Sequence, residues 1–393
     1  MRPPADVLEA LRAAPGAAPL LDALADVPGL WVVGGAVRDV LLDRVPRELD
    51  LVVEGDPAAV LAALPGSVVQ HDRFGTATVV PAGATQAHDV VRARRETYAH
   101  PGALPEVQPA SIDEDLLRRD LTVNALALRV GAGNPELRGA PGAVEDLEAG
   151  VLRVLHDASF RDDPTRLWRT ARYAARLGFA VEPHTRALAA AADPTTVSGT
   201  RTGNELRHAL REPDPLAVLA QARALNARLL PDALTTAPPR LADALALLPP
   251  DGRADLLTLA ACVEPMPAAE VVRWLDELAF PAADRDVVAA GSREMVRTPL
   301  RRARTATEIG RAARGVPVEV VALAGGDQAR RWIDDLRHRR LAISGADLLA
   351  AGVPQGPELG ARLAAALDAC LEDEAPDRAS QLAVALGTRL SRE

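Results

Sequence analysis

Residues 31–56, WVVGGAVRDVLLDRVPRELDLVVEGD, determine the fold expected for the N-terminal part of this chain. An apolar strand is predicted to run into Gly34 and Gly35, and a short helix to follow. A second apolar strand then carries Glu48 and Asp50. Because residues two apart on a strand point to the same face, these two carboxylates are expected to project together. The stretch therefore predicts a strand–turn–helix–strand unit that holds two acids near a glycine turn.

This unit has the residue types that phosphoryl transfer requires. Two backbone N–H groups at a glycine turn leading into a helix can bind an anion. Arg38 adds a fixed cation suited to phosphate oxygens, and the two carboxylates can hold Mg²⁺. The pattern is typical of a two-metal site. The alternative is an ordinary strand, turn and helix with two acids at a sheet edge.

Two further stretches carry polar residues in helical spacing. Residues 118–127 read RRDLTVNALA, and residues 160–179 read FRDDPTRLWRTARYAARLGF. In the second stretch, Asp163 is expected to cap a helix with Pro164 at its first position. Arg166, Arg169 and Tyr173 then fall on one helix face. Taken singly, each stretch can also be a solvated charge cluster, and Asp163 a simple helix cap.

Together these stretches resemble the class II tRNA nucleotidyltransferase and bacterial poly(A) polymerase family, whose patterns are GGxVRD…DxD, RRDFTxNAxA and EDxxRxxR. Glu48 departs from the pattern, because the family usually has Asp there, and the longer side chain changes the metal geometry. The resemblance implies that Glu48 and Asp50 hold two Mg²⁺ ions. It assigns the phosphates to Gly34, Gly35, Arg38 and Arg119, a ribose hydroxyl to Asp120 and Asn124, and the base to Asp163 and Arg166, with Arg169 supporting the phosphates or Asp163.

Residues 71–98 add a possible third acid and a loop. Asp89 lies among apolar residues of a predicted strand, where the resemblance suggests a third catalytic carboxylate; a structural role is the alternative. Arg94, Glu96 and Tyr98 resemble the RxExY segment of the family, which precedes a mobile loop. The alternative for that loop is a surface turn rich in Pro and Gly.

Composition limits the classes of partner. The chain has 393 residues, a formal net charge of −9 and no lysine, so all 45 basic residues are arginines. The net charge argues against a sequence-wide electrostatic grip on nucleic acid, although a local basic face remains possible. The arginines and histidine of residues 330–340 are the candidate for such a face. Without an apolar run long enough to span a membrane or a signal-peptide pattern, a soluble cytoplasmic protein is expected.

The distribution of β-branched runs predicts an α+β protein. Short strands alternate with helices up to about residue 155, and the rest of the chain has helical periodicity. The resemblance implies a polymerase-β-type nucleotidyltransferase head with a mixed β-sheet, then an all-helical neck, body and tail. The expected boundaries are 1–155 for the head, 156–212 for the neck, 213–328 for the body and 329–393 for a tRNA-binding tail.

The function implied by the resemblance is template-independent addition of CCA to the 3′ end of tRNA from CTP and ATP. A-only addition is the nearest alternative, because LDLVVEGD, FGTATV, ETYAHPGALP and DDPTR resemble a sub-branch that includes A-adding enzymes. CC-only addition and poly(A) synthesis are further alternatives. A catalytically reduced tRNA-binding protein is the alternative outside the enzymes. It is suggested by Glu48 and Gly139, which stand where the family patterns have Asp.

Overall fold

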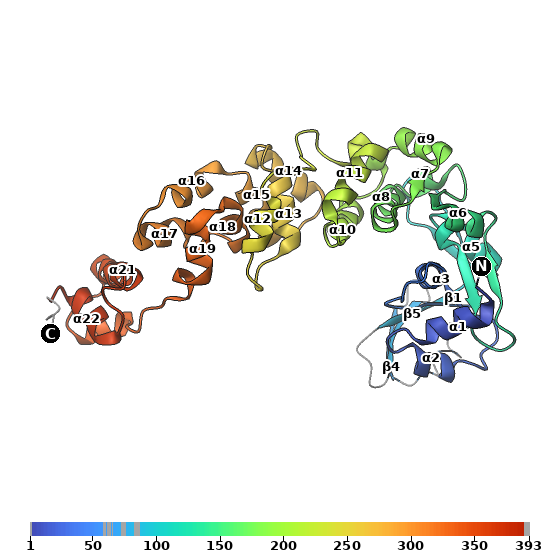
Figure 1. Ribbon diagram of the computed structural model, residues 1–393, viewed down its shortest axis with the longest axis horizontal. Coiled ribbons are helices and arrows are strands. Elements are labelled where there is room, and N and C mark those ends of the chain that lie inside the picture. The colour runs from blue at the N-terminus through green and yellow to red at the C-terminus, as the bar shows by residue number, and fades with distance from the viewer. Residues whose placement is uncertain are drawn as a thin grey trace. The chain divides into compact units, whose positions relative to one another are not determined.

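The computed structural model of the chain describes residues 2–57, 60, 64, 66–71, 76–81 and 87–388. These residues form two compact units, Met1–Leu230 and Pro231–Glu393. Figure 1 shows a sheet with helices at the start of the first unit, and helices throughout the second. The expected α+β class, with a mixed sheet followed by helices, is confirmed. The finer division into head, neck, body and tail stays a prediction.

The main sheet of the first unit is mixed, and its strands lie in the order β3-β4-β5-β2-β1-β8-β9. Strands β2 and β5 pair in parallel, whereas the other neighbouring strands pair antiparallel. The bounds are β1 Leu30–Val33, β2 Asp50–Val53, β3 Gly66–His71, β4 Thr76–Pro81, β5 His88–Arg92, β8 Leu126–Arg129 and β9 Leu137–Gly139.

The two ends of the opening stretch meet at the centre of this sheet. Strand β1 pairs with β2 so that Val33, the residue before the glycine turn, lies opposite Asp50. The turn leads directly into α3 (Gly35–Leu41). One detail differs from the sequence prediction, because β2 begins at Asp50 and Glu48 lies just before the strand. The in–out alternation nevertheless continues, since Glu48 and Asp50 are exposed and Leu49 between them is buried.

A small apolar cluster fixes the helix α5 (Ile112–Leu117) against the sheet. Ile112 is fully buried with Trp31, Val33 and Val52. The helix starts with a capping box in which the Ser111 hydroxyl accepts from the backbone N–H of the third helical residue. The position of α5 matters because the two arginines that follow it enter the site described below.

Two short pairs of strands lie outside the main sheet. Strands β6 (Arg94–Thr97) and β7 (Glu106–Pro109) form an antiparallel hairpin. Strands β10 (Val151–Leu152) and β11 (Ala180–Val181) pair in parallel. Strands β7, β9 and β11 were not predicted from the sequence, because they are short and lack a β-branched run. The run at 151–155 forms β10 and does not join the main sheet.

Helices predominate after β10, as expected. In the first unit they are α7 Ser159–Asp162, α8 Thr165–Leu177, α9 Pro183–Ala191, α10 Gly199–Leu210 and α11 Pro215–Leu225; α6 Ala143–Ala149 lies just before β10, and α1 Pro4–Arg12 and α2 Ala17–Ala23 precede the sheet. Helix α8 begins at Thr165, one residue later than predicted. Asp163 still accepts a hydrogen bond from the Thr165 N–H (3.0 Å), as a capping residue does.

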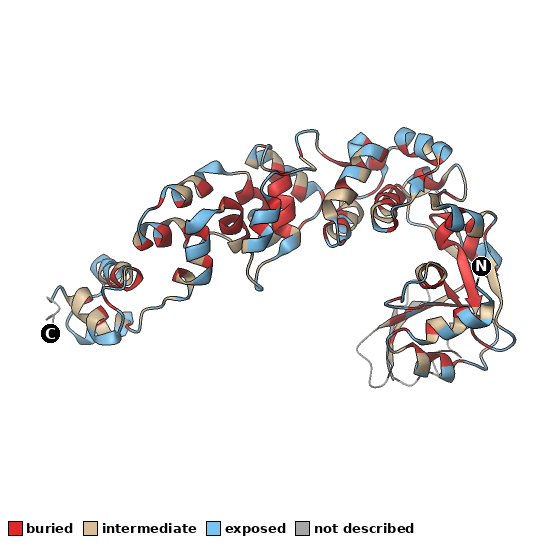
Figure 2. Cartoon of the chain, viewed as in Figure 1, coloured by how far each residue is buried: buried red, intermediate tan, exposed pale blue. Residues whose placement is uncertain are grey.

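The second unit packs around two helices that are apolar on nearly all sides. Helix α13 (Ala254–Cys262) is buried continuously from Leu256 to Cys262. Helix α18 (Val318–Ala324) is buried from Glu319 to Ala324, and Figure 2 shows both helices almost wholly in the buried colour. A helix that is apolar all round belongs in a core. The other helices of this part of the unit are α12 Leu241–Leu247, α14 Ala268–Glu277, α15 Ala282–Gly291, α16 Glu294–Arg302, α17 Ala306–Ala313 and α19 Gly326–Asp334.

The last helices of the second unit form a separate apolar cluster. Helices α20 (Gly345–Ala350), α21 (Pro357–Leu371) and α22 (Arg378–Leu386) contribute to it. Among the residues that the structure covers, no helix is both long and apolar enough to cross a membrane.

The cluster under α5 generates a stability prediction. Ile112→Ala should lower the free energy of unfolding by about 2–5 kcal/mol, because it opens a cavity in a closely packed core. Leu117→Ala is the matched control on the same helix, since Leu117 is 51% exposed; it should change the value by less than about 0.5 kcal/mol. Chemical denaturation of both variants checks this, and equal effects would contradict the described packing of α5.

Candidate active site

The glycine turn between β1 and α3 requires glycine at its first position. Gly34 has a φ of +70°, which L side chains rarely adopt, and a Cβ there would lie 2.9 Å from Nη1 of Arg119. Its N–H donates to the Leu126 carbonyl at 2.8 Å. The amide of Gly34 is therefore already occupied, and only the shape of the turn and the amides after it remain for a ligand.

Arg38 lies beneath this turn and is 2% exposed. Its Nε and Nη2 donate to Asp39 at 2.9 and 2.7 Å, and its Nη1 donates to the side-chain oxygen of Asn124. The ring of Tyr173 lies 5.1 Å from the guanidinium carbon. The structure thus places Arg38 inside the protein, where it connects α3 to the 118–127 motif; its direct contact with a phosphate stays a prediction.

The three predicted acids come from two adjacent strands. In the parallel pairing of β2 with β5, Asp50 lies directly opposite Asp89. Glu48 is two residues before Asp50, so the acids cluster at one end of these strands. Asp89 also accepts a hydrogen bond from the Thr78 hydroxyl at 2.8 Å.

The acid cluster has the electrostatics of a cation site. Burial is the main cause that raises the pKa of Asp50, and the negative charges of Glu48 and Asp89 raise it further, while Arg119 opposes the shift. A bound divalent cation would relieve this repulsion. Within the described residues, no group of three or more His, Cys, Asp or Glu side chains is arranged to hold a metal.

A buried histidine holds the backbone between Glu48 and Asp50. His88 is 1% exposed, and its Nδ1 accepts a hydrogen bond from the Leu49 N–H at 3.0 Å. Burial lowers the pKa of His88, which favours the neutral ring that this acceptor role requires. His88 was not predicted as a site residue, because a single histidine beside a strand acid forms no recognisable pattern in the sequence.

An arginine-lined cavity of about 400 Å³ opens beside the glycine turn. Its floor includes Gly34, Gly35 and Asp50. Its walls bring together most of the predicted nucleotide-binding residues: Arg119, Asp120, Asn124, Asp163, Arg166 and Arg169. Arg38, Glu48 and Asp89 do not line it. We refer to it as the arginine cavity.

Asp115 orients two arginines of this cavity and was missed in the sequence analysis. Its fully buried carboxylate accepts from Nε of Arg118 at 2.9 Å and from Nη2 of Arg119 at 2.9 Å. Burial alone would raise the pKa of Asp115, but Arg119 and Arg118 outweigh it and lower the pKa. Nε of Arg119 is buried and has no hydrogen-bond partner among the described residues. The role of Asp115 could not be predicted from the sequence, because only the folded helix α5 brings its carboxylate to both arginines.

Asp120 joins the sheet to helix α8. One carboxylate oxygen accepts from Nδ2 of Asn124 at 3.0 Å, and the other accepts from Nε of Arg169 at 2.7 Å. Burial opposes ionisation, but Arg169 and the bond from Asn124 hold the pKa of Asp120 down at about 2. Both residues predicted to bind a ribose hydroxyl are thus hydrogen-bonded to each other inside the protein.

Asp163 and Arg166 lie on the opposite wall. Oδ1 of Asp163 accepts from the Thr165 hydroxyl and from Nη2 of Arg201 at 2.6 and 2.8 Å. Within the described structure, no donor contacts its other oxygen. Arg166 is 5% exposed and donates to the Ser159 hydroxyl and the Arg118 carbonyl, each at 2.7 Å. These bonds fix the guanidinium plane and leave further N–H groups for a ligand.

The hairpin β6–β7 closes another side of the arginine cavity. The Tyr98 hydroxyl donates to Glu96 at 2.9 Å, and burial together with Glu96 raises the pKa of Tyr98. The connection after Tyr98 is held at Gly102, whose N–H donates to the Arg161 carbonyl and whose carbonyl accepts from Arg201. A Cβ at Gly102 would lie 2.3 Å from the Thr196 carbonyl oxygen, so the segment described as a mobile loop by the resemblance packs closely against the helices.

A second cavity, of about 650 Å³, adjoins the first. It shares Gly35, Asp50 and Tyr173 with the arginine cavity, and Glu48 lines only this one. Its other cationic and aromatic-ring groups are Arg38, Arg44, Arg47, Arg172, Arg176, His208 and Arg211. We call it the Glu48 cavity. Asp50 is therefore accessible from two sides, each lined by arginine.

Comparison with known proteins agrees with this geometry. Residues 30–153 match the model of the Poly A polymerase head domain. An A-adding tRNA nucleotidyltransferase of Geobacter sulfurreducens is 33% identical over 398 aligned residues, which cover 91% of this chain and 45% of that protein. A CC-adding tRNA nucleotidyltransferase of Deinococcus radiodurans is 43% identical over 194 residues, or 47% of this chain and 51% of that one.

A solved structure extends the likeness to the whole chain. The Thermotoga maritima CCA-adding enzyme, complexed with tRNA, superimposes with a TM-score of 0.72 at 25% identity, and the match covers 98% of both chains. The chain spans about half the length of the first curated relatives it matches. Residues 30–153 therefore match a Poly A polymerase head domain, and along its length the chain is similar to tRNA nucleotidyltransferases in sequence and fold.

Proposed function

We propose that this chain adds nucleotides to the 3′ end of tRNA without a nucleic-acid template, using CTP and ATP. The observation that carries the proposal is the meeting of two arginine-lined cavities at Asp50. Transfer of a nucleotide needs a triphosphate on one side of the catalytic acids and an attacking hydroxyl on the other. The two cavities supply one compartment for each substrate.

The arginine cavity suits the nucleoside triphosphate. Arg118 and Arg119 are oriented by Asp115 and face the cavity, so their guanidinium groups are fixed before a ligand arrives. A preorganised guanidinium binds phosphate with little loss of side-chain freedom. Asp120 and Asn124 line the same cavity and are proposed to contact the ribose, with Gly34, Gly35 and Arg38 shaping the phosphate end.

Asp163 and Arg166 are proposed to select the base. Cytosine and adenine each present an exocyclic amine beside a ring-nitrogen acceptor. The free oxygen of Asp163 can accept from the amine, and Arg166 can donate to the ring nitrogen. Uracil and guanine present the opposite pattern and would leave both groups unpaired, which is unfavourable by about 1–3 kcal/mol for the buried guanidinium of Arg166.

The acid cluster fits Mg²⁺, and Glu48, Asp50 and Asp89 are the residues proposed to hold or surround it. When bound, Mg²⁺ would neutralise phosphate charge and lower the pKa of the attacking hydroxyl. The protein's own part is to hold Asp50 at the junction of the two cavities, through the β2–β5 pairing and the His88–Leu49 bond. The tRNA 3′-hydroxyl then attacks the α-phosphate, the bond to the β-phosphate breaks, and pyrophosphate leaves.

The proposal assigns residues 1–155 to catalysis as a head, 156–212 to base selection as a neck, 213–328 to a body and 329–393 to a tail. Full CCA addition is the leading activity. A-only addition is the second candidate, because the Geobacter sulfurreducens relative that aligns with 91% of this chain is named an A-adding enzyme.

The acceptor end of the tRNA distinguishes these activities. The purified chain should be incubated with Mg²⁺ and labelled CTP or ATP on tRNAs that end at the discriminator base, at C or at CC. Full CCA addition predicts C incorporation on the first two and A incorporation on the third. Incorporation of A alone, on the CC-ending tRNA, would establish the A-adding activity, and no incorporation with intact tRNA binding would leave a binding protein.

Loss of the central acid should abolish transfer. Asp50→Asn is expected to lower the rate of incorporation by about 10³-fold or more. The reason is that the cation loses a charged ligand at the junction of the two cavities proposed for the substrates. Dissociation constants for tRNA should change little. Asp26→Asn is the control, since Asp26 is an exposed acid of the same unit with no ion pair among the described residues. An Asp50→Asn variant with normal turnover would refute the metal assignment.

Asp163→Asn should weaken base selection. Replacing one carboxylate oxygen by an amide donor removes the acceptor for the exocyclic amine. The ratio of kcat/KM for CTP and ATP over UTP and GTP should fall about ten- to a hundredfold. Asp157→Asn serves as the control, because Asp157 is 81% exposed in the turn before α7, where its carboxylate pairs with His184. Unchanged discrimination in the Asp163 variant would remove it from base recognition.

A further inference from the structure

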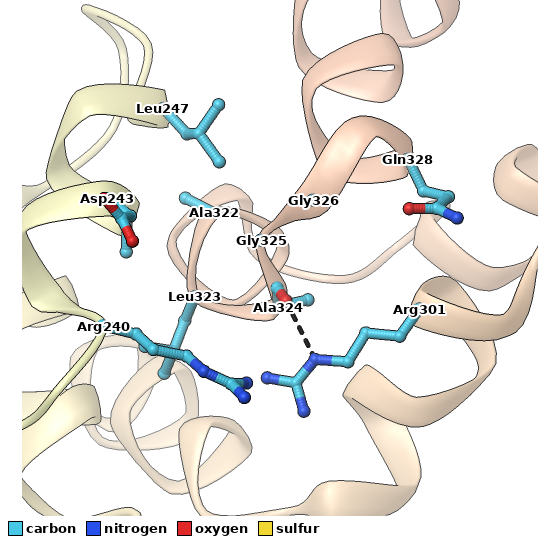
Figure 3. Close-up of a pocket in the computed structure, with 11 residues that line it drawn as sticks. Arg240, Asp243, Leu247, Arg301, Ala322, Leu323, Ala324, Gly325, Gly326 and Gln328 are labelled. Carbon is cyan, nitrogen blue, oxygen red and sulfur yellow. Dashed lines mark hydrogen bonds between the residues drawn. The ribbon is translucent and has the colours of Figure 1, made fainter.

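A third cavity lies within the second unit, about 400 Å³ in volume, between α12, α16, α18 and the start of α19. Figure 3 shows Arg240 and Arg301 on its floor, with their guanidinium groups pointing toward each other. Two cations that face each other repel unless an anion lies between them. Among the residues that the structure describes, no carboxylate bridges the pair.

The bonding of the two arginines leaves N–H groups for a ligand. Arg301 donates through Nε to the Ala324 carbonyl at 2.8 Å and through Nη1 to Glu294 at 3.2 Å. Its Nη2 is buried and has no hydrogen-bond partner among the described residues. The side chain of Arg240 is exposed and has no ion pair or hydrogen bond in the described part of the chain. Such an unsatisfied buried donor beside an unpaired cation favours an anionic ligand.

A third arginine, Arg297, lies close enough to the pair to sense its charge. Arg297 is 6% exposed, and burial, together with the positive charges of Arg301 and Arg240, lowers its pKa to about 10. Glu264 and Glu294 pair with Arg297. The N-terminus of α19, with Gly325 as its cap and Gly326 as its first residue, also lines the cavity and carries a partial positive charge.

The rest of the lining identifies the kind of anion. Asp243 lies on the rim, and Leu247, Ala322 and Leu323 make an apolar wall. No lining residue is aromatic, so a base would find no ring to stack on. A phosphate between the arginines, a sugar against the apolar wall and a hydroxyl donating to Asp243 would satisfy all three features. This combination is one step of an RNA backbone, because the ribose 2′-hydroxyl is the donor that DNA lacks.

We propose that this cavity, between Arg240, Arg301 and Asp243, binds a phosphodiester and the adjoining ribose of the tRNA substrate. The inference rests on the proposed function and deepens it by naming where the helical unit holds RNA. In the 330–340 cluster, Arg337 pairs with Asp251 at 2.6 Å, and Arg339 pairs with Asp335 and Asp373 at 2.8 and 2.6 Å. Those two arginines are already neutralised, whereas Arg240 is not.

Binding of tRNA to the full chain tests the proposal. Dissociation constants for a tRNA that lacks CCA should be measured by fluorescence anisotropy over a range of KCl concentrations. Arg240→Ala is the informative variant, because no described side chain depends on Arg240. It should weaken binding about three- to tenfold and reduce the salt dependence of log K by about 0.7–0.9. Arg273→Ala is the matched control, an exposed arginine of the same unit that lies outside the cavity, and it should have no effect.

Two further arms identify the ligand. Asp243→Asn should weaken binding of an RNA acceptor hairpin more than that of its all-DNA copy, because only RNA offers the 2′-hydroxyl. Inorganic phosphate and ATP should bind no differently to wild type and Arg240→Ala at concentrations that leave tRNA bound. If ATP or phosphate affinity depends on Arg240 while tRNA affinity does not, the cavity is a small-anion site and the proposal is wrong.

The outcomes separate this inference from the proposed function. Wild-type protein that fails to bind tRNA would overturn both. Wild-type protein that binds tRNA and adds nucleotides, with an Arg240→Ala variant that binds equally well at every salt concentration, would overturn only the RNA cavity. Arg301→Lys is a second test variant, used because alanine at position 301 would unfold the protein. Lysine keeps the positive charge but loses the two-sided contact that a guanidinium makes with a phosphate.

Discussion

The buried carboxylate of Asp120 accepts hydrogen bonds from Arg169 of helix α8 and from the side chain of Asn124. The side-chain oxygen of Asn124 in turn accepts a hydrogen bond from Arg38, which lies beneath the glycine turn. This chain of charged hydrogen bonds connects helix α8, the 118–127 motif and helix α3 behind the glycine turn. Removing one partner from such a buried network leaves the others uncompensated, at a cost of several kcal/mol. The relative positions of the three sequence motifs depend on it.

Around this network, the protein separates residues that line the cavities from buried residues that hold them in place. Asp115 and His88 are buried and each holds a neighbour: Asp115 orients Arg118 and Arg119, and His88 holds the Leu49 amide between the acids. Neither lines the arginine cavity. The substrate-facing groups are therefore rigid because buried groups satisfy one side of them, as effective preorganisation requires.

Much of this arrangement could be predicted from the sequence, because its motifs are local. The strands at 30–33 and 50–53, the turn at Gly34 and the helical face of Arg166, Arg169 and Tyr173 all follow from short-range pattern. What could not be predicted is long-range pairing. The sequence does not reveal that β2 and β5 run parallel with Asp50 opposite Asp89, nor that Arg38 is buried under the turn. It also gave no sign that the Gly34 amide is occupied by Leu126, because that bond joins residues 92 positions apart.

The absence of lysine has a consequence for how the protein responds to pH. Every cation that lines the arginine cavity is a guanidinium, which keeps its charge throughout the range in which proteins are folded. Asp120, with its pKa near 2, is equally constant, and the network it anchors stays ionised from acidic to alkaline buffer. The grip on a triphosphate should then be nearly uniform across that range. Any dependence of turnover on acidity must arise at the strand-end carboxylates, at the attacking hydroxyl or on the nucleotide itself.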